Sequence, residues 1–76
     1  MKSSIEDFGT GWYGMTIQLG KDDIDKLIEC LQLLKQDEGF HFHMFSTAFE
    51  TEIGGIADIE FSQSSSKDTS NMDIGG

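Results

Sequence analysis

Two short segments of alternating polarity constrain the fold of this chain more than any other feature. They span residues 39–46 and 55–62. Because successive side chains of a strand point to opposite faces, the alternation predicts two strands paired as an antiparallel hairpin. One face would carry apolar side chains, namely Phe40, Phe42, Met44, Ala57, Ile59 and Phe61. The other face would carry a mixed set, namely His41, His43, Phe45, Ile56, Asp58 and Glu60.

A strand and a helix are predicted upstream of this hairpin. Residues 11–19 alternate, with an apolar side formed by Tyr13, Met15, Ile17 and Leu19. Trp12 lies on the opposite side with Gly14, which either leaves a gap for a neighbouring ring or marks a bulge. Residues 21 to about 37 have the apolar spacing of an amphipathic helix, with a stripe of Ile24, Leu27, Ile28, Leu31 and Leu34.

These elements predict one small α+β domain over residues 1–76, in the order β-α-β-β. One helix would pack across one face of a small, mostly antiparallel sheet. Residues 72–74 alternate once more, so they form either a further edge strand or a frayed end. Residues 1–10 and 64–71 lack periodicity, and we expect a mobile lead-in and a flexible loop there.

The charge of the chain narrows the choice of partner. The chain contains fourteen acidic and five basic residues, which gives a formal net charge of −9. All the basic residues are lysines, so the planar arginine fork that suits phosphates and base edges is missing. We therefore expect no direct binding to nucleic acid. An acidic surface suits a basic partner protein, although acidity also serves solubility alone.

The expected compartment is the cytoplasm. No apolar run approaches the roughly 20 residues of a membrane span. Residues 1–7 lack the apolar region of a secretory signal. The one cysteine, Cys30, allows no disulfide within the chain. We expect neither a membrane-spanning segment nor a membrane partner.

One face of the predicted sheet would stay open. A helix about 10 Å wide covers only one face of strands that lie about 4.8 Å apart. Exposed aromatic rings beside charged groups are typical of protein interfaces. The open face and the acidic connection at 47–54 would therefore bind a partner protein through Trp12, His41, His43, Phe45, Glu50, Glu52, Asp58 and Glu60.

The same face offers a set of metal ligands. His41, His43 and Glu60 are the residues that would hold zinc or ferrous iron, because both ions accept imidazole and carboxylate ligands. Pairing between histidine and carboxylate across the strands explains these residues without a metal, so we expect no cofactor. An enzyme is not expected either, since Cys30 lies beside the apolar stripe of the helix.

Several segments, considered together, suggest a family. They are the Trp12-Tyr13-Gly14 strand, the helix from Asp22, the His41-Phe42-His43 strand, residues 54–61 and residues 71–74. In these segments the chain resembles the small acidic immunity proteins of bacterial polymorphic toxin systems. The resemblance implies an α+β fold and tight binding to one cognate protein toxin. The predicted function is thus non-enzymatic inhibition of a toxin through the open face.

Two other functions stay open. The chain can be a metal- or pH-responsive homodimer that buries the same face against a second copy. It can also be an acidic mimic of nucleic-acid phosphates that blocks a nuclease. Binding by such a mimic would weaken steeply with salt, whereas an interface anchored by aromatic rings would be less sensitive.

Overall fold

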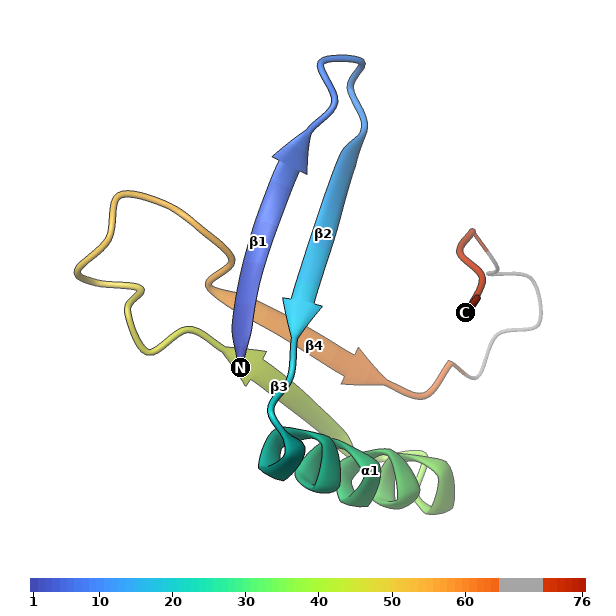
Figure 1. The fold of residues 1–76 in the computed structure, drawn as a ribbon. Helices are drawn as coiled ribbons and strands as arrows, with labels where there is room; N and C mark the ends of the chain where they lie inside the picture. Colours follow the sequence, from blue (N-terminus) through green and yellow to red (C-terminus); the bar gives the residue numbers. More distant parts are fainter. Residues whose placement is uncertain (65–70) are drawn as a thin grey trace.

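The computed structural model describes residues 1–64 and 71–76. Within them the chain forms β1 (Lys2–Asp7), β2 (Tyr13–Gln18), α1 (Lys21–Gln36), β3 (His41–Phe45) and β4 (Asp58–Ser62). The predicted α+β class is confirmed. The strands do not form one sheet, however, but two antiparallel two-stranded sheets, β1–β2 and β3–β4 (Figure 1).

β1 corrects the expectation of a mobile lead-in over residues 1–10. Its residues, Lys2–Asp7, pair along their whole length with Tyr13–Gln18. Gly9 and Gly11 lie in the turn at φ 74° and 91°, a backbone region that glycine adopts without steric cost. Because only a short connection has to close, this pairing costs little chain entropy compared with pairing between distant strands.

A glycine in β2 accommodates an aromatic ring. A Cβ built on Gly14 would lie 2.7 Å from Cζ of Phe8, which is closer than real Cβ atoms approach. Gly14 also pairs in register with Glu6, without a bulge. The gap predicted at Gly14 is therefore present, and the ring of Phe8 fills it.

Helix α1 begins after Gly20 and ends at Gln36, within one residue of the predicted end. At its first turn, the carboxylate of Asp23 accepts a hydrogen bond of 3.0 Å from the backbone N–H of Gly20. The same carboxylate lies 2.9 Å from the N-terminal ammonium of Met1. The pKa of Asp23 is lowered, mainly by the bond to this ammonium and to a smaller extent by the hydrogen bond from Gly20.

The face of α1 that packs against the strands is rotated slightly from the apolar stripe predicted from the sequence. Its half-buried apolar side chains are Leu27, Cys30 and Leu34. Those on the exposed flank are Ile24, Ile28 and Leu31. The helix packs against β3. The last turn of the helix also contacts the residue after β4, because the Gln63 amide donates a hydrogen bond of 3.1 Å to the Leu34 carbonyl.

β3 and β4 form the antiparallel hairpin that the alternation predicts. The register pairs Phe42 with Phe61 and Met44 with Ile59, and all four side chains are half-buried. The rings of Phe42 and Phe61 stack, with centroids 4.7 Å apart and planes 7° from parallel. The predicted apolar face of this hairpin is therefore confirmed over β3 and β4.

The alternation fails just before β4. Ile56 is half-buried and Ala57 is exposed, the reverse of the prediction. The reason is that β4 begins only at Asp58, so the preceding residues belong to the connection 46–57. This connection is closed by a hydrogen bond of 2.9 Å from the Ser46 N–H to the Ala57 carbonyl.

The apolar side chains line a hollow instead of filling a closed core. The hollow has a volume of about 630 Å³, and its walls include Ile17, Leu19, Leu27, Met44 and Ile59. No residue in 1–64 or 71–76 is fully buried. Tyr13 and Met15, expected in the core, are exposed because β2 pairs with β1 and projects away from β3 and β4 (Figure 1).

Residues 71–76 contain neither helix nor strand, so the edge strand considered at 72–74 does not form. Of the expected flexible loop at 64–71, residues 65–70 lie outside the described residues. Among the described residues, no helix combines the length and apolar character needed to cross a bilayer.

Candidate functional site

The outward face of the β3–β4 hairpin, meaning the face opposite its half-buried side chains, is the candidate site. It carries His41, His43 and Phe45 on β3 and Asp58 and Glu60 on β4, all of them exposed. The register places His43 opposite Glu60 and Phe45 opposite Asp58. The structure thus brings together these five predicted site residues, because alternation along two paired strands puts them on one face.

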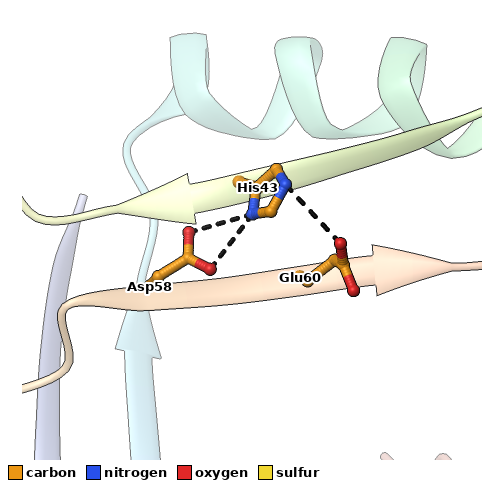
Figure 2. Close-up of polar contacts among 3 residues, drawn as sticks. All are labelled: His43, Asp58 and Glu60. Carbon is orange, nitrogen blue, oxygen red and sulfur yellow. Dashed lines mark hydrogen bonds and ion pairs between the residues drawn. The ribbon is translucent and has the colours of Figure 1, made fainter.

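His43 lies between two carboxylates on this face (Figure 2). Its Nδ1 is 2.9 Å and 3.1 Å from the two carboxylate oxygens of Asp58. Its Nε2 is 3.7 Å from Oε1 of Glu60. When the neutral ring donates its Nδ1–H to Asp58, the lone pair is left on Nε2, on the side of Glu60. The predicted pairing between histidine and carboxylate across the strands is therefore confirmed.

A second imidazole stands beside the first. The rings of His41 and His43 meet edge to face, with centroids 5.2 Å apart and planes at 82°. A ring nitrogen of each histidine and a carboxylate oxygen of Glu60 all lie within 4.8 Å of one another. Two nitrogens and one oxygen this close together need only small side-chain rotations to act as ligands for a divalent cation.

Phe45 supplies the apolar part of the outward face. Its side chain is 70% exposed, although it belongs to a paired strand. It stands opposite Asp58, so a large ring and a carboxylate share the end of the hairpin nearest the connection 46–57. Aromatic rings are the side chains most enriched at the centres of protein interfaces.

Trp12 does not join this face, contrary to the expectation of a single sheet. It lies in the connection between β1 and β2, where its carbonyl accepts a hydrogen bond of 3.1 Å from the N–H of Phe8. Its side chain is 77% exposed. Because β2 pairs with β1, the hairpin carries this connection away from β3 and β4 (Figure 1).

Glu50 and Glu52 also lie outside the outward face. Both are exposed residues of the connection 46–57, which joins the end of β3 to the start of β4. Glu52 borders the hollow between the hairpin and the helix. These carboxylates add negative charge near the Phe45 end of the hairpin without belonging to its strands.

An exposed apolar strip on the outer flank of α1 was not expected. It consists of Ile24, Ile28 and Leu31, each more than two-fifths exposed. The sequence indicates this strip indirectly. Cys30 and Leu33 widen the apolar stripe of the helix, and two strands cannot cover so wide a stripe.

The geometry of the outward face therefore combines an exposed ring, two adjacent imidazoles and two carboxylates on paired strands. Such a face is suited to contact with another molecule. Comparison of the whole chain with models of protein families, with curated proteins and with solved structures finds no match.

Proposed function

We propose that this chain is a non-enzymatic inhibitor that binds a basic partner protein through the outward face of the β3–β4 hairpin. The observation that carries the proposal is Phe45, a ring 70% exposed on a paired strand and placed opposite the carboxylate of Asp58. Covering such a ring with a partner removes apolar surface from water, which favours association.

The extended shape of the chain supports a binding role. Its accessible surface is 7063 Å², whereas a compact monomer of this mass exposes about 4,600 Å². Its radius of gyration is 14.4 Å, against about 11 Å for a compact chain of this length. A standard interface covers about 800 Å² of each partner, which is less than the extra surface that this chain exposes compared with a compact monomer.

The charge of the chain favours a basic partner over a second copy. The formal net charge is −9, so two copies meeting face to face would repel each other. Asp58 and Glu60 lie on the outward face itself, and Glu50 and Glu52 lie in the adjoining connection. A basic surface opposite these carboxylates gains fast association and selectivity.

The resemblance to immunity proteins suggests the class of partner. In that role the chain would cover the active site of a cognate toxin, or a surface that the toxin needs. Phe45 would be the desolvated anchor, and Asp58 and Glu60 would meet basic residues of the toxin. Trp12, on the separate β1–β2 hairpin, would form a second contact with a partner large enough to reach it.

The experiment uses the product of the neighbouring gene as the candidate partner. Titration calorimetry of the purified proteins should show binding that Phe45→Ala weakens by about 30-fold, as expected for an anchor that contributes about 2 kcal/mol. Ile28→Ala is the matched control, because Ile28 is an apolar side chain 50% exposed on the outer flank of α1, away from both the outward face and the connection 46–57. Equal affinities for wild type and Phe45→Ala would rule out this face as the interface.

Two further measurements separate the alternatives. A phosphate mimic that blocks a nuclease would lose most of its affinity between low and high salt, whereas an interface anchored by Phe45 would retain much of it. A homodimer would sediment faster as the chain becomes more concentrated. The proposed inhibitor would sediment as a monomer at every concentration until its partner is added.

A further inference from the structure

The outward face of the β3–β4 hairpin also holds three metal-ligating side chains in one place. Alternation puts His41 and His43 on the same face of β3, and the register puts Glu60 directly opposite His43. One ligand atom from each lies within 4.8 Å of the others. Pairing of β3 with β4 fixes the backbone beneath all three residues, so little chain ordering is needed to bring the ligands together.

A fourth residue orients one of the ligands. Asp58 receives the Nδ1–H of His43 at 2.9 Å, which leaves Nε2 as the ligand atom of the neutral ring. A carboxylate bonded to the far nitrogen of a metal-binding histidine is the usual supporting arrangement in zinc sites. Nε2 of His43 is already 3.7 Å from Oε1 of Glu60, close to the edge of about 3.3 Å of a tetrahedron around zinc.

We propose that His41, His43 and Glu60 bind a divalent cation of the zinc class, and that Asp58 positions His43 for this role. Two imidazoles and one carboxylate suit zinc, whereas magnesium and calcium prefer ligand sets made entirely of oxygen. Three protein ligands leave a fourth coordination position. Because the three residues are exposed, this position faces outward and is open to water or to a ligand from another molecule.

The competing explanation is an ion pair without metal. In that case His43 would be held between Asp58 and Glu60 for structural reasons, and His41 would have no part in the arrangement. The two explanations differ in what they require of His41. Zinc binding needs a nitrogen of His41, whereas an ion pair centred on His43 does not.

The test is calorimetric titration of zinc chloride into the full chain after treatment with a chelator. Wild type should bind one equivalent. His41→Ala and Glu60→Gln should each weaken binding at least tenfold, and Asp58→Asn should weaken it by about 10- to 100-fold. Glu29→Gln is the matched control, because it removes an exposed carboxylate of α1 that lies outside both the outward face and the connection 46–57. Cys30→Ser is the control for binding through the thiol, and neither control should change the affinity.

Spectroscopy on wild type gives a readout that does not depend on the folding of a variant. With zinc bound, nitrogen NMR should show a metal-bound nitrogen in both His41 and His43, and His43 should coordinate through Nε2. The proposal is overturned if wild type shows no saturable binding or if His41→Ala binds zinc as tightly as wild type. Zinc that shifts only the resonances around Cys30 would overturn it as well.

Discussion

The stacked rings of Phe42 and Phe61 are predicted to be the largest single contribution to the stability of the β3–β4 hairpin. They lie 4.7 Å apart on neighbouring strands, and both are half-buried. Truncating a fully buried Phe to Ala costs about 3–5 kcal/mol, and the partial exposure of Phe61 lowers this cost to about 2 kcal/mol. Loss of the stacked pair adds about 0.5–1.5 kcal/mol. Phe61→Ala should therefore cost about 3 kcal/mol, against a total stability of roughly 4–11 kcal/mol for a chain of this length.

Urea unfolding followed by circular dichroism measures this loss. With a slope of about 1 kcal/mol per molar urea, Phe61→Ala should lower the midpoint by about 3 M or leave the chain unfolded in buffer. Phe49→Ala, which truncates a largely exposed ring in the connection 46–57, should change the stability by less than about 0.5 kcal/mol. If the two variants unfold at the same urea concentration, the packing described for β3 and β4 is wrong.

Further predictions concern the β1–β2 hairpin and the helix. Gly14→Ala should displace the ring of Phe8 and destabilise the chain by about 1 kcal/mol, whereas in a Phe8→Ala background the same change should cost nothing. Thermal unfolding of wild type, the two single variants and the double variant tests this. Because the pKa of Asp23 is lowered in the folded chain, its contribution to stability should be present above the ordinary aspartate pKa and lost as pH falls through the folded value. The difference in melting temperature between wild type and Asp23→Asn should therefore shrink with acidification. Ile28→Ser, on the exposed flank of α1, should leave the stability within about 0.5 kcal/mol of wild type in urea unfolding.

The elements with strong periodicity could be predicted from the sequence. The helix bounds follow from apolar spacing, and the two faces of the β3–β4 hairpin follow from alternation that continues through both strands. β1 could not be found in this way, because Ile5 is its one large apolar residue and the strand is exposed throughout. The glycines at positions 9 and 11 are the sequence feature that indicates its turn.

The missed strand explains why the candidate site was predicted only in part. Without β1, the sequence predicts a single sheet in which β2 lies with β3 and β4, and this sheet puts Trp12 on its open face. In the structure β2 pairs with β1 instead, and Trp12 lies in the turn of this separate hairpin. His41, His43 and Glu60 did not depend on that choice, since their placement requires only β3 and β4.

The contact of Asp58 with His43 could not be predicted from alternation alone. Alternation puts both residues on the outward face, but the register decides which groups meet. Asp58 stands opposite Phe45, and its carboxylate reaches diagonally to His43. Such diagonal pairs depend on side-chain conformation, which the sequence pattern does not specify.

We propose that the outward face of the β3–β4 hairpin is the surface through which this protein binds its partner. The most direct test is an NMR titration of the isotope-labelled chain with the unlabelled product of the neighbouring gene. We expect the largest changes in chemical shift at His41, His43, Phe45, Asp58 and Glu60, with little change on the outer flank of α1. Changes confined to Ile24, Ile28 and Leu31, with the β3–β4 hairpin unaffected, would contradict it.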